Sequence, residues 1–129
     1  MGDQVLIVSA DAKLKGLVTP LLEGLGFEPK AFATIVEAAK AFAAGITPAL
    51  IILDRDQPQG QSAYVFLRQL KADGVQTPVV VVASGASAED LLAGFRLGAV
   101  EVLRKPTRAG VIRAMLTRVM PPAAPPEES

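Results

Sequence analysis

Asp54 is the residue in this sequence that is best placed to do chemistry, because it directly follows the apolar run Ala49–Leu53. Continuous apolar runs of this length are typical of buried strands in parallel sheets, and ligands bind beyond the carboxyl ends of such strands. Lys105 follows a second strand-like run, 100–103, and would place a cation at the same edge of the predicted sheet, where the carboxyl ends of the strands lie. A carboxylate can accept a phosphoryl group when nearby cations neutralise the charge on the phosphoryl oxygens. The pair therefore indicates a phosphoacceptor site.

The other acidic residues that such a site needs are only partly present. Ser9, Ala10 and Asp11 follow a third predicted strand, Gln4–Val8, and only Asp11 is acidic. Mg²⁺ takes oxygen ligands in octahedral geometry, which one carboxylate alone supplies poorly. Asp11 stands where the first helix begins, so we favour a helix cap over a displaced metal ligand. The site resembles a phosphoacceptor site that has lost part of its metal-binding set.

Composition narrows the classes of protein. The chain has 129 residues, 50% of them hydrophobic, which predicts one globular domain. It contains no cysteine and no histidine, which excludes disulfides, thiolate chemistry, soft metal sites and a histidine base. A bound cation would be magnesium or calcium, held by oxygen. We expect a cytoplasmic protein, since no apolar run approaches a membrane span and strand 4–8 leaves no room for a signal peptide.

Strand-like and helix-like segments alternate five times along the chain. This alternation predicts an α/β fold with a doubly wound parallel sheet covered by helices on both faces. Pro20 is expected to kink or interrupt the first helix. The Pro-rich segment 121–129 is predicted to be a tail or linker after a domain of residues 1–120. Strands are expected over Gln4–Val8, Phe27–Ala33, Ala49–Leu53, Val79–Ala83 and Val100–Leu103, and helices over Ala12–Leu25, 35–44, Ser62–Ala72, 88–98 and 108–120.

Helix caps mark where three of the helices begin. Thr34 and Glu37 form the pattern of a capping box before the second helix. Ser87 and Asp90 have the same spacing before the fourth helix, and Thr107 is the expected cap of the fifth.

Several short motifs occur in a fixed order and together carry a resemblance. They are the strand-end Asp54, Asp56-Gln57-Pro58 with Gly60, Thr77-Pro78, Leu97-Gly98-Ala99 and Lys105-Pro106. In this order they resemble the receiver domain of two-component response regulators, from Gln4 to about Met120. The resemblance implies a flavodoxin-like fold, with five parallel strands in the order 2-1-3-4-5 and five helices.

The resemblance also implies roles for single residues. Asp54 would take a phosphoryl group from a histidine kinase, and Lys105 would contact that group. An acidic pair after the first strand would hold Mg²⁺, with help from the backbone carbonyl of Asp56. The bond before Pro106 would be a cis peptide.

This sequence departs from the receiver pattern where the chemistry is most demanding. Ser9 and Ala10 occupy the acidic-pair positions, and Ala83 occupies the position of a Ser or Thr hydroxyl. Val102 stands where the family usually has a switch aromatic, while Ser84 is expected to point differently by strand alternation. We expect a degenerate receiver, not an enzyme, that acts through protein contacts with phosphorylation weak, absent or bypassed. The alternative is a working phosphoacceptor with an unusual metal site.

The remaining residues of the site have interpretations of their own. Asp54 and Lys105 are expected to form an ion pair across neighbouring strand ends. Such a pair could have a purely structural role, without any phosphoryl chemistry. The side chain of Asp56 is expected in solvent, so Asp54 and Asp56 would make at most a weak magnesium site. A flavin or nucleotide binder on the same fold is disfavoured, because the chain has no Trp and no dinucleotide-binding glycine motif after a strand.

The region from residue 96 to residue 118 contains six basic residues and one acid, Glu101. We favour a solvated surface over a face for an acidic partner. A signalling partner, such as a histidine kinase, would meet the fourth helix, fifth strand and fifth helix. Direct binding of nucleic acid or membrane is not expected. The basic residues of that face are Arg96, Arg104, Arg108 and Arg113.

Overall fold

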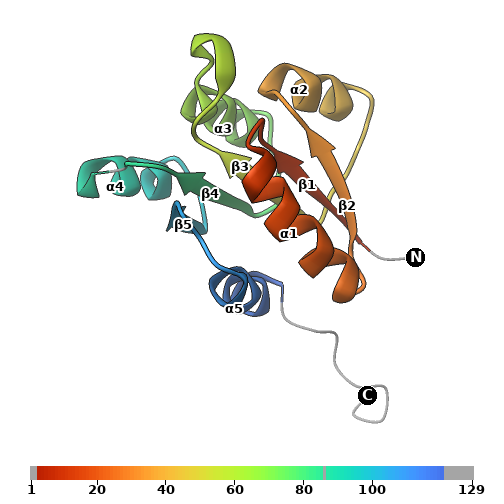
Figure 1. The fold of residues 1–129 in the computed structure, drawn as a ribbon. Coiled ribbons are helices and arrows are strands. Elements are labelled where there is room, and N and C mark those ends of the chain that lie inside the picture. Colours follow the sequence, from red (N-terminus) through yellow and green to blue (C-terminus); the bar gives the residue numbers. More distant parts are fainter. Residues whose placement is uncertain (1–2, 86, 121–129) are drawn as a thin grey trace.

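A computed structural model describes residues 3–85 and 87–120 of the chain. Within these residues, five parallel strands form one sheet in the order β2-β1-β3-β4-β5, as the sequence predicted (Figure 1). The strands are β1 (Gln4–Val8), β2 (Glu28–Phe32), β3 (Leu50–Asp54), β4 (Val79–Ala83) and β5 (Glu101–Arg104). The helices are α1 (Ala12–Gly24), α2 (Ile35–Ala43), α3 (Ala63–Ala72), α4 (Ala88–Arg96) and α5 (Ala109–Val119), with a 3-10 turn at Pro58–Gly60.

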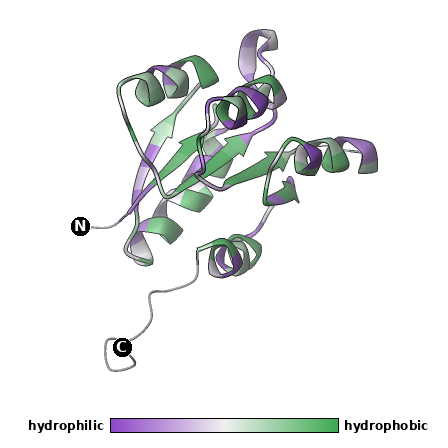
Figure 2. Ribbon diagram, turned by 180° about the vertical axis from the view of Figure 1, so that it is seen from behind, coloured by the Kyte–Doolittle hydropathy of each residue, from purple (hydrophilic) through white to green (hydrophobic). Residues whose placement is uncertain are grey.

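The sheet has an apolar core on each face, because side chains alternate along every strand. Val5, Ile7, Leu50 and Ile52 pack against α1 and α5, while the residues between them pack against α2 and α3. The helices lie on both sides of the sheet, and the inner strands are apolar along most of their length (Figure 2). Asp54 is the last residue of β3 and is the polar end of an otherwise apolar buried strand.

Two expectations about helices were wrong in part. Helix α1 is not interrupted at Pro20, since it runs unbroken from Ala12 to Gly24. Pro20 is exposed, so the Gly16 carbonyl that loses its hydrogen bond lies on the solvent side, while Leu14 and Val18 hold the helix on the sheet. The Thr34 capping box is only half formed. Thr34 Oγ1 accepts a hydrogen bond from the Glu37 N–H at 3.2 Å, but the Glu37 carboxylate accepts one from the Thr34 hydroxyl, at 3.4 Å, and not from the Thr34 backbone N–H.

The caps of the last two helices differ. Ser87 and Asp90 form the complete capping box that the spacing predicted at α4. Thr107 does not cap α5, because the chain is still extended at Arg108 and the helix therefore begins at Ala109. Thr107 Oγ1 is left buried without a hydrogen-bond partner among the described residues.

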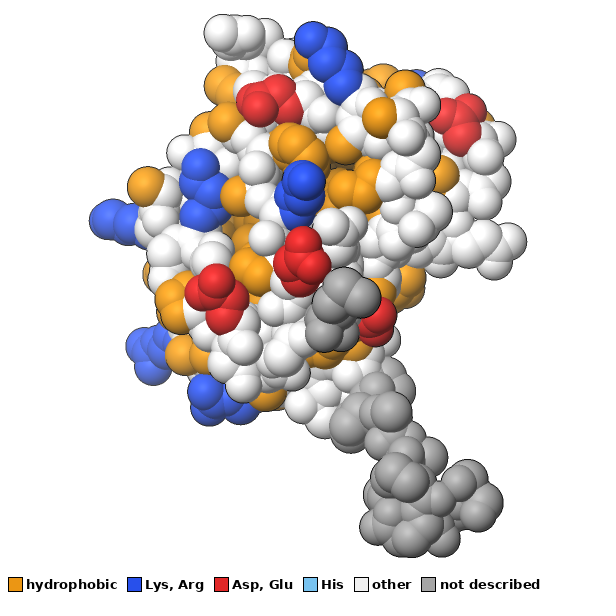
Figure 3. All heavy atoms as spheres, turned by 90° about the vertical axis from the view of Figure 1, so that its right-hand side faces the viewer, with side chains coloured by type: hydrophobic (Ala, Val, Ile, Leu, Met, Phe, Trp, Pro, Cys, Tyr) orange, Lys and Arg blue, Asp and Glu red, His pale blue; other side chains and the backbone are white. Residues whose placement is uncertain are grey.

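One side of the molecule carries mixed charge. On the side shown in Figure 3, acidic, basic and apolar side chains are interspersed, with no large region of one sign. Among the described helices, none has the length and apolar character to cross a membrane. The predicted tail, residues 121–129, lies outside the described residues.

Candidate functional site

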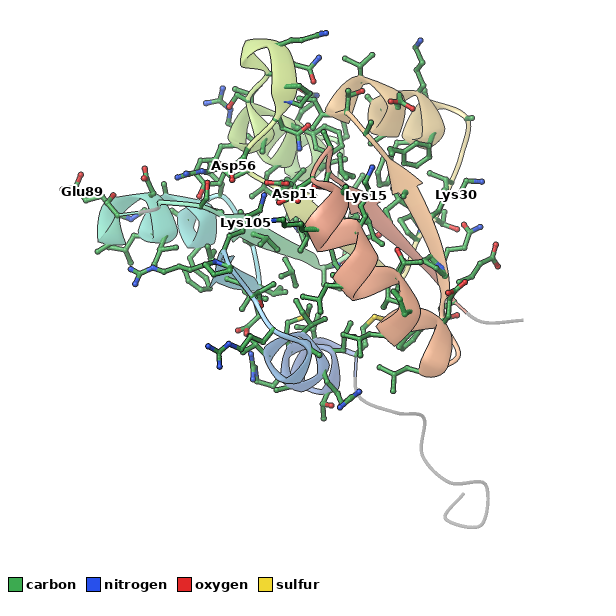
Figure 4. The ribbon with its side chains drawn as sticks, viewed as in Figure 1. Asp11, Lys15, Lys30, Asp56, Glu89 and Lys105 are labelled. Atoms are coloured by element: carbon green, nitrogen blue, oxygen red, sulfur yellow. The ribbon has the colours of Figure 1, made fainter. Side chains whose placement is uncertain are left out.

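The candidate site lies at the carboxyl ends of the strands. Ser9 follows β1, Asp54 ends β3 and Lys105 follows β5. Figure 4 shows Asp11, Asp56 and Lys105 together at this edge, whereas Lys30 and Glu89 lie away from it. The sheet order brings these residues close together, because parallel strands place all their carboxyl ends at one edge.

Asp54 is enclosed by hydrogen-bond donors. Ser9 Oγ donates to Asp54 Oδ2 at 2.6 Å, and the Asp56 N–H donates to Asp54 Oδ1 at 2.8 Å. Lys105 Nζ lies 2.7 Å from Asp54 Oδ2. The Asp54 side chain is only 1% exposed, so both of its oxygens are engaged by protein donors and nearly closed to solvent.

Lys105 is shared by three carboxylates. Its Nζ lies 3.0 Å from Asp11 Oδ2 and 3.4 Å from Asp56 Oδ2, in addition to Asp54. Burial works to lower the pKa of Lys105, but the hydrogen bonds and charges of Asp54 and Asp11 outweigh it and raise that pKa. The ammonium group therefore stays charged and neutralises part of the acidic cluster.

The strands that carry Asp54 and Lys105 are not neighbours, contrary to our expectation. Strand β4 lies between β3 and β5, so the lysine side chain spans the end of β4. The Lys105 N–H donates to the Ala83 carbonyl at 2.8 Å, which fixes the start of this side chain beside β4. The Lys105–Pro106 peptide bond is cis.

Asp11 has two contacts of different kinds. One carboxylate oxygen caps α1 by accepting the N–H groups of Lys13 and Leu14. The other oxygen meets Lys105, and this hydrogen bond is the first of the interactions that lower the pKa of Asp11. Asp11 is thus both a helix cap and a member of the charge cluster.

The expectation that the Asp56 side chain points into solvent was wrong. Asp56 Oδ2 accepts hydrogen bonds from Ser84 Oγ at 2.7 Å and from the Ser84 N–H at 3.1 Å. Burial works to raise the pKa of Asp56, but these bonds and Lys105 outweigh it, so the pKa is lowered. Ser84 therefore contacts Asp56 at the rim and does not replace the hydroxyl that Ala83 lacks.

Arg55 joins the site to α4, a contact that the sequence analysis did not predict. Arg55 Nη1 donates to Asp90 Oδ2 at 3.1 Å, and Arg55 Nη2 donates to the Ser84 carbonyl. Asp90 is also the N3 residue of the α4 capping box. The loop after β3 is therefore tied to the first turn of α4.

Val102 and Tyr64 lie together beneath α4. A Cβ atom on Gly94 of α4 would stand 3.0 Å from Val102 Cγ2 and 3.2 Å from Tyr64 Oη. The Tyr64 hydroxyl, which comes from α3, donates to the Asp90 carbonyl at 2.8 Å. Helix α4 therefore approaches β5 and α3 closely, and glycine is the residue that permits this approach.

The predicted basic face is solvent-exposed. The four arginines proposed for it are exposed, and none of them forms an ion pair within residues 3–85 and 87–120. Arg118 instead pairs with Glu101. Large apolar side chains are also exposed on α4, on the turn before β5 and on α5, namely Leu92, Phe95, Val100 and Val111.

The donor set fits a divalent cation poorly. Ala10 offers no side-chain ligand, and Ser9 directs its hydroxyl proton to Asp54. Asp11, Asp54 and Asp56 all face the Lys105 ammonium. In the part of the chain that the structure describes, no group of three acidic side chains has the spacing to hold a metal ion.

Comparison with known proteins points to receiver domains. Residues 5–117 match the family model described as the response regulator receiver domain. The Regulator of RpoS from Escherichia coli (strain K12) is 31% identical over 108 residues, covering 84% of this chain and 32% of that protein. The DNA-binding response regulator MtrA of Mycolicibacterium paratuberculosis is 30% identical over 124 residues, covering 92% of this chain and 53% of MtrA. The chain thus spans between a third and about half of these relatives.

The fold agrees with that match. The chemotaxis response regulator CheY4 of Vibrio cholerae superposes with a TM-score of 0.81 at 24% identity, covering 93% of this chain and all of CheY4. The family match, together with this fold, identifies the chain as a receiver domain of two-component signalling. The chain belongs to the response regulator receiver domain family. Receiver domains interact with histidine kinases and other signalling proteins, are generally not enzymes, and typically bind Mg²⁺ at the phosphorylation site.

Proposed function

We propose that this chain is a receiver-like module that signals through protein–protein contacts, with phosphorylation at Asp54 weak, absent or bypassed. The carrying observation is the closure of Asp54, whose two oxygens accept bonds from Ser9, Lys105 and the Asp56 N–H. A carboxylate that attacks a phosphoryl group needs an oxygen within reach of the donor. Here Ser9 and Lys105 hold Oδ2 and the Asp56 N–H holds Oδ1, so the contacts on one of these oxygens must open before that oxygen can attack.

The test is intact-mass measurement after incubation with acetyl phosphate and magnesium, with Asp54→Asn as the matched control. We expect no phosphoryl adduct, or a minor one, at Asp54. Stoichiometric modification that Asp54→Asn abolishes would contradict the proposal.

Weak magnesium binding belongs to the same proposal. A divalent cation would have to displace the Lys105 ammonium from its three carboxylates and would find no carboxylate at Ser9 or Ala10. Calorimetric titration should therefore show no submillimolar affinity. Submillimolar binding that disappears in Asp54→Asn would overturn this part.

One observation favours the alternative, a working phosphoacceptor with an unusual metal site. The structure brings Asp11 to the cluster, where it meets the same ammonium as Asp54 and Asp56. If Lys105 swings away, three carboxylates remain at one edge of the sheet, and they would have to draw closer together to share a metal ion. Under this alternative, Asp11→Asn lowers both magnesium affinity and phosphorylation. Under our proposal, both are already low in the unmodified chain, so Asp11→Asn changes them little.

The partner face is proposed to be α4, β5 and α5. Support comes from the exposed Arg96, Arg104, Arg108 and Arg113 beside exposed apolar side chains such as Phe95. Aromatic and arginine side chains are enriched at interfaces, and basic residues favour an acidic partner. The association rate with that partner should fall as salt rises, and Phe95→Ala should weaken the complex at all salt concentrations.

This face is proposed to stay in one conformation whatever the state of Asp54. Arg55 holds Asp90, while Tyr64 and Val102 fill the space beneath Gly94. Amide NMR shifts over residues 84–108 should barely change when beryllium fluoride is added as a phosphoryl mimic. Large shifts spreading from Asp54 into that face would mean that the switch works.

The proposed module covers residues 1–120, and residues 121–129 would serve as a linker or tail.

A further inference from the structure

Ser84, the first residue after β4, is held by the two residues that follow Asp54. Its N–H and its hydroxyl donate to Asp56 Oδ2, at 3.1 and 2.7 Å. Its carbonyl accepts a hydrogen bond from Arg55 Nη2. The N–H, the carbonyl and the hydroxyl of Ser84 are therefore all engaged by Arg55 and Asp56. We call this arrangement the Ser84 clamp, and it joins the loop after β3 to the loop after β4.

The Ser84 clamp is connected to Asp54 on one side and to α4 on the other. The Asp56 N–H donates to Asp54 Oδ1 at 2.8 Å, and within residues 3–85 and 87–120 it is the one donor on that oxygen. Arg55 Nη1 donates to Asp90 Oδ2 at 3.1 Å, in the first turn of α4. A continuous series of contacts thus runs from α4 through Ser84 to the less enclosed oxygen of Asp54.

We propose that Asp54 is held closed from the side of α4. Arg55, through Asp90 and the Ser84 carbonyl, fixes the loop that keeps Asp56 in place, and the Asp56 N–H covers Asp54 Oδ1. Arg55 and Asp90 are then positioning residues for Asp54. The inference rests on the proposed function, in which Asp54 is closed, and it identifies the contacts that regulate this closure. Loss of the contact between Arg55 and the first turn of α4 would loosen the enclosure of Asp54.

The test is amide hydrogen exchange of the Asp56 N–H in the full chain, because this group exchanges when its contact with Asp54 Oδ1 opens. Asp90→Asn keeps an oxygen for the Ser87 N–H of the capping box, but it removes the charge that pairs with Arg55. This ion pair is partly exposed, so we expect the Asp56 N–H to exchange about two- to fivefold faster.

Glu89→Gln is the matched control for Asp90→Asn. It removes the same charge from the same turn of α4. In the part of the chain that the structure describes, Glu89 has no ion pair, and Figure 4 shows it away from the site. Exchange of the Asp56 N–H should not change in Glu89→Gln. Unchanged exchange in Asp90→Asn, or an equal increase in both variants, would overturn the proposal.

A second pair of variants tests the same contacts from the other end. Arg55→Gln removes both the ion pair and the bond to the Ser84 carbonyl, so exchange of the Asp56 N–H, corrected for its intrinsic rate, should rise about tenfold. Arg68→Gln changes an exposed arginine of α3 that has no ion pair among the described residues, and it should have no effect. Equal effects of the two arginine variants would overturn the proposal, and this pair decides if Asp90→Asn fails to fold.

The exchange measurement is separate from the test of the proposed function. Stoichiometric modification of the unaltered chain by acetyl phosphate would contradict the proposed function. Unchanged exchange of the Asp56 N–H in Asp90→Asn and Arg55→Gln would contradict the role of the Ser84 clamp alone.

Discussion

The pairing of Asp54 with Lys105 makes a quantitative prediction for stability. Removing the lysine with Lys105→Met leaves the Asp54 carboxylate, which is 1% exposed, without its cation. Breaking a buried pair from one side costs about 3–5 kcal/mol. Because Lys105 is itself 14% exposed, water offsets part of this loss, and we expect a decrease of about 3 kcal/mol in the free energy of unfolding.

Adding Asp54→Asn to Lys105→Met should restore part of the lost free energy of unfolding. Asp54→Asn removes the unpaired charge, and the amide oxygen can still accept the Asp56 N–H. The double variant Asp54→Asn with Lys105→Met should therefore be more stable than Lys105→Met alone. We expect a coupling energy of about 2 kcal/mol between the two positions.

Urea unfolding at neutral pH and low salt measures all four corners of this cycle. Lys15→Met is the matched control, because Lys15 has no ion pair among the described residues, and its cost should stay within about 0.5 kcal/mol. Additivity of the two single variants within about 0.5 kcal/mol would refute the reasoning, since independent sites add to that accuracy.

Three further predictions concern other parts of the molecule. The lowered pKa values of Asp11 and Asp56 mean that their contribution to stability is present above the ordinary value of about 3.9 and is lost as the pH falls through their folded values. The urea concentration at the unfolding midpoint should therefore decrease when the pH is lowered below about 4, and this decrease should be smaller in Asp56→Asn. An equal dependence of the midpoint on pH in Asp56→Asn would contradict the role assigned to Asp56. Thr107→Val removes a buried, unpaired hydroxyl and should raise the free energy of unfolding by about 1 kcal/mol; a loss of similar size would mean that the hydroxyl has a partner. Gly94→Ala should cost about 1–3 kcal/mol by overpacking, whereas Gly16→Ala, which meets no atom within 4 Å, should stabilise by about 0.5–1 kcal/mol in thermal unfolding; similar effects at both glycines would refute the close approach of α4.

The sequence was most informative where the fold depends on burial. Strands β1 and β4 begin and end where predicted. Runs such as Val79–Val82 are buried on both faces, so the apolar stretch in the sequence is not interrupted by polar residues. Edge strand β2 is shorter than predicted, because a half-exposed strand carries a weaker signal.

The site was predictable only in outline. The strand-end positions of Asp54 and Lys105 follow from the alternation of elements, since every parallel strand delivers its carboxyl end to one edge. The contacts of Asp56 with Ser84, and of Arg55 with Asp90, depend on the path of two loops, which hydrophobic periodicity does not encode. Tyr64 was missed for a similar reason, because its partner lies on another helix.

The place of β1 in the sheet has a consequence for how the chain folds. Strand β1 lies between β2 and β3, and Val5 pairs with both Pro29 and Leu50. Its second neighbour therefore comes from much later in the chain, and a loop containing α1, β2 and α2 must close before β1 is paired on both sides. Loop closure of this kind costs entropy before the pairing repays it. Until β3 has been synthesised, β1 has one edge without a strand partner, and unpaired strand edges favour aggregation.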